Sequence, residues 1–451
     1  MQVIVIETPS LGDRSYIVHD GADVLVIDPQ RDLDRVLAAV EDAGLRVSHV
    51  AETHLHNDYV SGGLVLVRMT GATYVHAQAE PLRFDYHAVA DGDRFRVGTL
   101  DVEVVHTPGH TPHHLSYIVR QQGEPPAAFT GGSLLYGTVG RTDLISPEMT
   151  EALTRSQHRT AHRLASMLPD DARLYPTHGF GSFCASAPRQ GASDGTLGTE
   201  RAINIALTVD NEDRFVERLV SGLSAFPAYY AHMGPLNAAG PVPVDISPPA
   251  PVDPVELARR IHRGDWVVDL RQRRLFASEH LTGTIGIELA DQFSTYLGWL
   301  IPWGTPITLL GETEEQVADA QRQLLRIGID RPSGAATGDG PAAWAPDHDR
   351  ASYPAVTFAG LGRRNGGTIL DVRRADELAA RGAIRGAVHI PIDEILRRID
   401  ELPEGPLWVH CASGFRASIA ASLLHRAGKE VVLIDDGFDN AADGGEPVDP
   451  V

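Results

Sequence analysis

Histidines gather in three short segments, each of which follows a strand-like run of residues. The segments are THLHNDYVSGG at residues 53–63, HTPGHTPHH at 106–114 and PTHG at 176–179. Neutral imidazole and carboxylate groups are ligands that suit zinc and Fe(II). His54 and Asp58 lie in one loop with a further histidine between them, so they can converge on one ion. Taken singly, four other histidines are expected to be surface or satisfied core residues: His106, His113, His114 and His162.

A second candidate for chemistry is the segment CASGFR at residues 411–416. It follows a buried-strand run at 407–409 and precedes a helical pattern at 417–427. The Cys411 thiol therefore lies just before a helix N-terminus, where unpaired N–H groups and the helix dipole favour a thiolate. Arg416 adds a full positive charge, and the small loop residues let backbone amides surround the sulfur. We predict that Cys411 and Arg416 form a catalytic pair.

The other cysteine, Cys184, has no cation near it in the sequence and is expected to be a small packed residue. Because the two cysteines are far apart and fall in different predicted domains, a disulfide framework is excluded.

Length and charge limit the function classes. The 451 residues suggest about three domains. A net charge of −21 argues against a nucleic-acid or anionic-membrane partner. No apolar run is long enough to span a bilayer, and the first residues lack the basic head of a signal peptide, so we expect a cytoplasmic location.

Two Pro- and Gly-rich stretches, 236–254 and 332–346, are typical of linkers. They predict domains at 1–240, 250–335 and 353–451. The first block alternates short β-branched runs with helical stretches, an α/β pattern in which polar loops follow strand ends.

The second and third blocks resemble each other. VVDLR at 267–271 recurs as ILDVR at 369–373, and PITLLG at 306–311 recurs as PLWVHC at 406–411. A duplicated α/β module explains these ordered matches. Gly311 and Gln316 stand where the later copy has Cys411 and Arg416, so the middle block is predicted to be a non-catalytic spacer or docking domain.

The order HxHxD, then TPGHT, then a third histidine resembles the metallo-β-lactamase fold, an αββα sandwich, in its glyoxalase II and persulfide dioxygenase branch. The GRTDL segment at 140–144 is similar to the persulfide dioxygenases. This resemblance implies one Fe(II) held by the first histidine of HxHxD, the histidine of GHT and the aspartate of an FTGD segment. The first two are His54 and His110.

The chain departs from that pattern at the third ligand. The segment at 129–132 is FTGG, so Gly132 stands in place of the aspartate, and Tyr59 replaces a histidine that dinuclear zinc hydrolases use. We expect a mononuclear site in which His56 completes the set, with Asp58, water or a metal-free site as alternatives. Fe(II) is the expected metal and zinc the alternative. Three residues are assigned to the rim of the site or to the support of its ligands: Asp58, His178 and Tyr59.

The CASGFR loop resembles the active-site loop of rhodaneses, and two further segments support the match: DVR at 371–373 and GAVHIP at 386–391. Rhodaneses carry sulfane sulfur as a cysteine persulfide, here on Cys411. A tyrosine-phosphatase-like loop is the competitor, but that family has five residues between cysteine and arginine, whereas this loop has four.

The full domain order is similar to persulfide dioxygenase and sulfurtransferase fusions, with an inactive rhodanese-like domain before the active one. This resemblance implies that a low-molecular-weight thiol persulfide is oxidised by O2 to sulfite, and that Cys411 transfers a further sulfur to give thiosulfate, in sulfide detoxification. The alternatives are a zinc-dependent, glyoxalase II-like thioester hydrolase and a sulfurtransferase whose first domain is metal-free. The thiol carrier and a homo-oligomeric state are left open.

Overall fold

A computed structural model describes residues 1–187, 195–362, 366–444 and 447–450. The chain divides into two compact units, Met1–Val244 with Leu325–Gly328, and Asp245–Leu324 with Ile329–Val451. Across the described ranges, no helix combines the length and the apolar character that a membrane span requires.

The first unit contains a six-stranded sheet in the order β1 to β6. β1 to β3 are antiparallel, and β3 to β6 are parallel. The strands are β1 (Gln2–Thr8), β2 (Asp13–His19), β3 (Asp23–Ile27), β4 (Arg46–Ala51), β5 (Thr73–Ala77) and β6 (His87–Val89).

A second six-stranded sheet of this unit has the order β12-β11-β10-β9-β8-β7. Its neighbours are antiparallel except for the parallel pair of β10 and β11. The strands are β7 (Arg94–Val97), β8 (Leu100–His106), β9 (Leu115–Arg120), β10 (Ala127–Gly131), β11 (Arg173–Pro176) and β12 (Gly195–Thr196).

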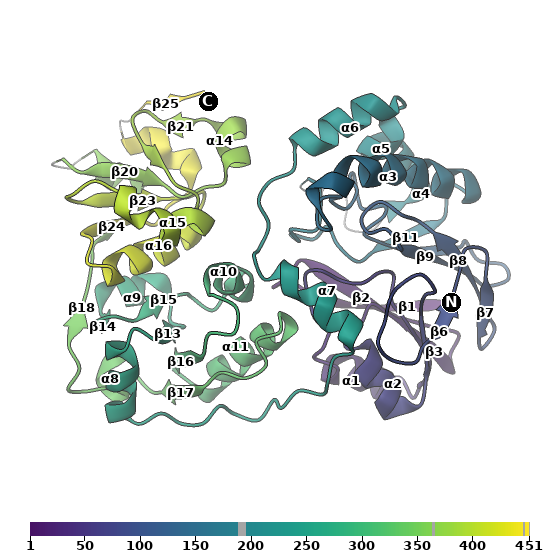
Figure 1. Cartoon of the computed structure of the whole chain (residues 1–451), viewed down its shortest axis with the longest axis horizontal. Helices are drawn as coiled ribbons and strands as arrows, with labels where there is room; N and C mark the ends of the chain where they lie inside the picture. Colours follow the sequence, from purple (N-terminus) through teal and green to yellow (C-terminus); the bar gives the residue numbers. More distant parts are fainter. Residues whose placement is uncertain (188–194, 363–365, 445–446, 451) are drawn as a thin grey trace. The chain divides into compact units, whose positions relative to one another are not determined.

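The core of this unit lies in three layers set by the two-residue period of the strands. Tyr16 and Val18 of β2 point between the sheets and meet Phe129 of β10. Ile17, between them, points outward to helices α1 and α2. The opposite outer face packs on α3 and α6, which gives the predicted αββα sandwich (Figure 1). The helices are α1 (Asp34–Asp42), α2 (Gly63–Thr70), α3 (Pro147–Met167), α4 (Leu197–Ile203), α5 (Ile205–Thr208), α6 (Glu212–Ser221) and α7 (Tyr230–Ala239).

Strand direction brings the histidine loops together. β8 is antiparallel to β9, β9 is antiparallel to β10, and β10 is parallel to β11, so β8, β10 and β11 all end at one edge. The loops that follow them carry His110, Gly132 and His178, and the loop after β4 carries His54.

The second unit contains two parallel sheets of the same construction. The first has the order β15-β13-β16-β17, and the second has the order β19-β24-β23-β20-β22. Their strands are β13 (Trp266–Asp269), β15 (Ile285–Gly286), β16 (Ile307–Gly311), β17 (Gly334–Thr337), β19 (Ala355–Val356), β20 (Thr368–Asp371), β22 (Val388–His389), β23 (Leu407–His410) and β24 (Val431–Ile434). Two short pairs are added: β14 (His280–Leu281) with β18 (Arg350–Ala351), and β21 (Ala383–Ile384) with β25 (Val448–Asp449).

Helices cover both sheets of this unit, as expected for parallel strands joined by crossovers. They are α8 (Pro254–His262), α9 (Arg273–Ser278), α10 (Phe293–Leu300), α11 (Glu314–Arg326), α12 (Pro341–Trp344), α13 (Phe358–Leu361), α14 (Ala375–Arg381), α15 (Ile395–Arg398) and α16 (Phe415–Arg426).

The predicted duplication is present in the strand register. Asp269 pairs with Leu310 and Gly286, and the corresponding Asp371 pairs with His410 and His389. Each aspartate also binds the arginine two residues later, through side-chain Nε and Nη2 and the backbone N–H. The sequence repeat thus corresponds to a repeated buried ion pair. The predicted linker at 332–346 is wrong, because β17 and α12 fall within it and Trp344 is buried. The linker predicted at 236–254 overlaps the end of α7.

Phe129 offers a test of the core. Its ring is fully buried, stacked on Tyr175 and edge-on to Tyr16. We expect Phe129→Ala to lower the free energy of unfolding of this unit by about 3–5 kcal/mol, because the cavity cannot close around a sheet. Hydrogen exchange of β9 and β10 amides in denaturant measures this. Met69→Ala, at a site that is 60 % exposed, is the control and should change little; equal effects would contradict the assignment of the core.

Candidate functional site

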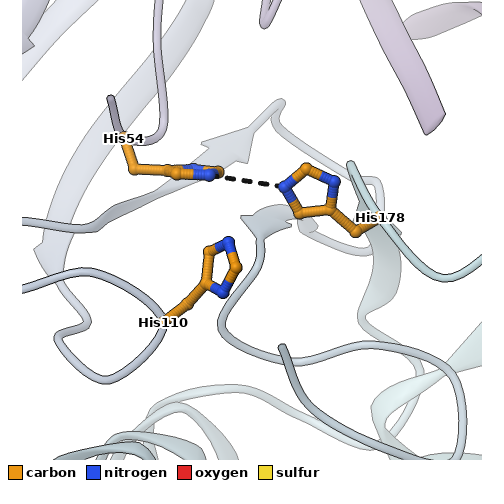
Figure 2. A group of neighbouring side chains, drawn as sticks. All are labelled: His54, His110 and His178. Atoms are coloured by element: carbon orange, nitrogen blue, oxygen red, sulfur yellow. Dashed lines mark hydrogen bonds between the residues drawn. The ribbon is translucent and has the colours of Figure 1, made fainter. Parts of the chain in front are cut away.

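Three imidazole rings converge at the edge where the strands end. His54, His110 and His178 are buried, and each offers one nitrogen within 4.8 Å of the others. The Nε2 atoms of His54 and His178 lie 3.3 Å apart, and the His110 ring points toward them (Figure 2). The Nε2 atom of His110 is buried without a hydrogen-bond partner.

The opposite nitrogen of each ring is held by a neighbouring group. His110 Nδ1 donates to the carbonyl of Arg141 at 2.7 Å, and His178 Nδ1 donates to Asp13 at 2.8 Å. His54 Nδ1 lies 2.8 Å from the Thr53 hydroxyl, which itself donates to Asp28, so it is His54 that donates to Thr53. All three Nδ1 atoms are therefore occupied, and the three Nε2 atoms are left to face one another.

Asp28 fixes the loops that carry these rings. It follows β3 with a φ of 52° and is fully buried. Its carboxylate accepts from the Thr53 N–H at 2.6 Å, from the Thr53 hydroxyl at 2.7 Å and from the Thr177 hydroxyl. One side chain thus ties together the residues that precede His54 and His178.

The protonation states differ among the three rings. Burial lowers the pKa of His110 to about 3 and that of His54 well below its usual value, so both are neutral. Burial also opposes the charged form of His178, but the carboxylates of Asp58 and Asp13 outweigh it and raise its pKa to about 10. Without a metal, the His178 Nε2 proton therefore points at the His54 Nε2 lone pair.

The second histidine of the HxHxD segment, His56, lies beside this cluster, with its ring centroid 4.1 Å from that of His54. With Asp58 and His178 it forms another group of closely spaced potential metal ligands, and its Nδ1 atom is buried without a hydrogen-bond partner. His56 Nε2 lies 3.2 Å from both Asp28 and Glu52, and 3.0 Å from the Tyr59 hydroxyl. Burial lowers the pKa of His56, but these two carboxylates raise it to about 9. Asp28, Glu52 and His56 form a further group of buried, closely spaced potential ligands.

Gly132 stands where the resemblance places an aspartate, and no side chain fits there. A Cβ atom at this position would overlap Cδ2 of His110. The Gly132 N–H donates to His114 Nε2 at 2.9 Å, and the His114 ring stacks on His54. The His110 ring therefore occupies the space beside residue 132.

These positions differ from the expected arrangement. His54 and His110 lie together with His178, which the sequence placed at the rim, whereas His56 is grouped with Asp58 and His178. Which of these residues hold a metal stays a prediction. The Asp58 carboxylate lies 3.2 Å from His178 Nδ1. Asp13 and Asp28 are not among the residues predicted from the sequence, although Asp28 directly follows the end of β3, a position that could have marked it.

The three-histidine cluster fits a divalent metal ion. Two nitrogens bound at zinc–nitrogen distances across a tetrahedral angle lie about 3.3 Å apart, which matches the His54 and His178 pair. The unpartnered His110 Nε2 supplies a third lone pair. His54, His110 and His178 are thus the candidate metal ligands.

The predicted nucleophile lies in the second unit. Cys411 follows β23 directly, α16 begins at Phe415, and the Gly414 N–H donates to the Cys411 sulfur at 3.1 Å. Cys411 is 1 % exposed. The thiol thus lies before a helix N-terminus, as the sequence predicted, with a backbone N–H directed at it.

Arg416 is not a free cation. Both of its terminal nitrogens bind the Glu377 carboxylate, Nη2 at 2.7 Å. Burial raises the pKa of Glu377, but Arg416 outweighs this and lowers it to about 2. Arg416 therefore acts on the Cys411 loop as half of an ion pair.

The equivalent loop of the middle block has no such site. Gln316, in the position of Arg416, accepts from the Glu312 N–H at 2.7 Å, and Gly311 replaces the cysteine. Cys184, in the first unit, is fully buried, and burial raises its pKa well above the usual value.

Comparison with known proteins identifies two families in the chain. Residues 13–178 match the model of the metallo-beta-lactamase superfamily, and residues 359–443 match that of the rhodanese-like domain. A hydroxyacylglutathione hydrolase of Cereibacter sphaeroides is 32% identical over 183 residues, which are 40% of this chain and 67% of that protein. The chain belongs to the metallo-β-lactamase superfamily.

Other relatives include persulfide dioxygenases. The mitochondrial persulfide dioxygenase ETHE1 of Homo sapiens is 28% identical over 242 residues, which cover 53% of this chain and 80% of that protein. A crystal structure of a metallo-beta-lactamase from Staphylococcus aureus subsp. aureus COL has a TM-score of 0.67 and 26% identity, covering 75% of this chain and 99% of that one. The chain is thus an enzyme that joins a metallo-β-lactamase domain, homologous to persulfide dioxygenases, to a C-terminal rhodanese domain.

Metal affinity should depend on pH through His178. A metal ion at the three Nε2 atoms displaces the proton that a pKa of about 10 keeps on His178. Raising the pH removes this competitor, so Co²⁺ affinity should rise about tenfold per pH unit between pH 7 and 9. Competition with a chelator measures it. The His178→Gln variant should bind Co²⁺ weakly, and its affinity should depend less on pH. The matched His56→Gln variant should keep the native dependence of affinity on pH. The reverse result would assign the third ligand to His56.

Restoring the aspartate at position 132 should not strengthen metal binding. Because any Cβ there overlaps the His110 ring, both Gly132→Asp and the control Gly132→Ala should displace His110. We expect at least a tenfold loss of Co²⁺ affinity in each variant, measured by the same competition. Tighter Co²⁺ binding by Gly132→Asp alone would contradict this prediction and show that a carboxylate at position 132 acts as a metal ligand.

Proposed function

We propose that this enzyme oxidises a low-molecular-weight thiol persulfide to sulfite with O2, and that Cys411 then transfers a sulfane sulfur to sulfite to give thiosulfate. The observation that carries the first half is the convergence of three Nε2 atoms whose Nδ1 partners are all satisfied. Homology to ETHE1 persulfide dioxygenases supports the choice of substrate. The role that we propose for these two reactions is the removal of sulfide as thiosulfate.

The metal we propose is a single Fe(II) at His54, His110 and His178. When bound, it supplies coordination positions for reaction with O2, whereas zinc would supply an activated water. The protein's own contribution is to fix the orientation of the three rings, so that their Nε2 atoms face one another. Thr53, the Arg141 carbonyl and Asp13 do this at the Nδ1 atoms.

The atoms of the proposed reaction balance in two stages. In the first, one persulfide, one O2 and one water give one thiol, one sulfite and two protons. In the second, the Cys411 thiolate attacks the outer sulfur of another persulfide, releases the thiolate of the carrier and keeps the sulfur as a Cys411 persulfide. Sulfite then attacks that outer sulfur, which releases thiosulfate and restores the Cys411 thiolate.

The Cys411 loop is suited to the second stage. The Gly414 N–H directed at the sulfur, together with the following helix N-terminus, stabilises negative charge on a thiolate or persulfide. Joining both activities in one chain raises the local concentration of sulfite at the second site.

Zinc-dependent thioester hydrolysis is the second candidate. The 32% identity to a hydroxyacylglutathione hydrolase favours it, as does a ligand set made of three imidazoles. A sulfurtransferase with a metal-free first domain is the third candidate, favoured by the missing carboxylate at Gly132.

Oxygen uptake by anaerobically iron-reconstituted protein, supplied with glutathione persulfide, is the deciding experiment. We expect O2 consumption with sulfite and thiosulfate formed by the native chain. Cys411→Ser should consume O2 at the native rate but release sulfite only, because it cannot carry the second sulfur. His110→Ala should lose uptake and keep sulfur transfer from thiosulfate to cyanide.

Other outcomes select the other candidates. Stoichiometric zinc with turnover of S-lactoylglutathione would favour the hydrolase. Absence of bound metal after reconstitution, with intact sulfur transfer, would favour the metal-free domain. Thiosulfate formation by Cys411→Ser at the native rate would overturn the coupled scheme.

A further inference from the structure

A buried carboxylate lies directly against the Cys411 loop. Asp435, just after β24, has a side chain that is 5 % exposed. A Cβ atom at Gly414 would overlap its Oδ1 atom, and the φ of 91° at Gly414 independently favours glycine. The N–H of the same Gly414 donates to the Cys411 sulfur, so the Asp435 carboxylate lies against a residue that binds the thiol.

Two arginines from the non-catalytic rhodanese-like domain neutralise that carboxylate. Arg273 Nε donates to Asp435 Oδ1 at 2.6 Å, and Arg274 Nε donates to Oδ2. Arg274 Nη2 also donates to the Asp435 backbone carbonyl at 3.1 Å. Both arginines belong to α9, so the two charges come from a single helix of the other copy. Glu288, 2.7 Å from Arg273 Nη1, partly offsets the first of them.

The same domain contacts the start of α16 as well. The ring of Tyr296 in α10 lies 5.9 Å from that of Phe415, the first residue of α16. The Ser422 hydroxyl donates to the Gly286 carbonyl at 3.3 Å. The Cys411 loop and its helix are thus enclosed on one side by the copy that lacks a cysteine.

We propose that the non-catalytic domain is a working part of the sulfurtransferase site: Arg273 and Arg274 are positioning residues that neutralise Asp435 and so keep Cys411 reactive. An uncompensated anion beside the loop would disfavour a Cys411 thiolate and an anionic persulfide. The inference rests on the proposed role of Cys411 and gives the middle domain a function other than that of a spacer.

Other charged groups surround Cys411 and remain unchanged in the test. Arg416 and Glu377 neutralise each other, as do Asp371 and Arg373. Burial lowers the pKa of His410, so it is neutral. Besides Asp435, the groups that face the loop are Arg374, Arg416, Glu377, Asp371, Arg373, His410 and Tyr296.

The test is the pH dependence of Cys411 alkylation by iodoacetamide in the full chain, followed on the Cys411 peptide by mass spectrometry so that Cys184 does not interfere. In Arg273→Gln/Arg274→Gln, we expect the thiol pKa to rise by about one unit and alkylation at pH 7 to slow by up to tenfold. Sulfur transfer should slow in parallel. Adding Asp435→Asn should restore the thiol pKa and the rate of sulfur transfer, because it removes the uncompensated carboxylate.

The matched control is Arg426→Gln, which removes another arginine contact between the same two domains at the far end of α16, where Nη2 donates to the Asp265 carbonyl at 3.3 Å. It should leave the titration unchanged. Asp435→Asn alone should lower the thiol pKa, since it leaves Arg274 without this carboxylate and Arg273 paired with Glu288 only. This variant tests the proposal even if the double variant fails to fold.

An unchanged titration in these variants, or equal shifts in Arg426→Gln, would overturn the proposal. Failure of the proposed sulfur-transfer role gives a different result: Cys411→Ser would then keep native thiosulfate production, while the alkylation shifts would still report on the arginines.

Discussion

A buried carboxylate, Asp28, is the constraint on which the candidate metal site depends. Its left-handed backbone is unfavourable for most side chains, although aspartate tolerates it better than β-branched residues do. The strain is offset by hydrogen bonds from two hydroxyls and one backbone N–H, contributed by loops that are more than 120 residues apart. Because Thr53 and Thr177 directly precede His54 and His178, the distance between these rings is set by Asp28.

The sequence could predict which loops form the site, because their position follows from strand order alone. Strand-like runs followed by histidine mark the ends of β4, β8 and β11, and the order and direction of the strands place the ends of β8, β10 and β11 at one edge. The Cys411 loop was predictable for a simpler reason: its strand, small-residue turn and helix are contiguous in the chain.

The side-chain directions within those loops could not be predicted. His54 and His56 are two residues apart and point to different groups, His54 to His178 and His56 to Asp28 and Glu52. That difference is set by carboxylates that spacing does not mark. His178 joins the cluster through Asp13, which is 165 residues distant, and a single sequence carries no trace of such a pair.

The site without a carboxylate differs in charge from the arrangement that the resemblance implies. Three neutral imidazoles leave the double charge of a divalent ion intact, whereas an aspartate at position 132 would halve it. Such a centre attracts anions more strongly at its open positions, and it stabilises the lower oxidation state of a redox metal relative to the higher one. For the proposed Fe(II) at these three histidines, glycine instead of aspartate at position 132 thus favours ionised sulfur species and the reduced metal.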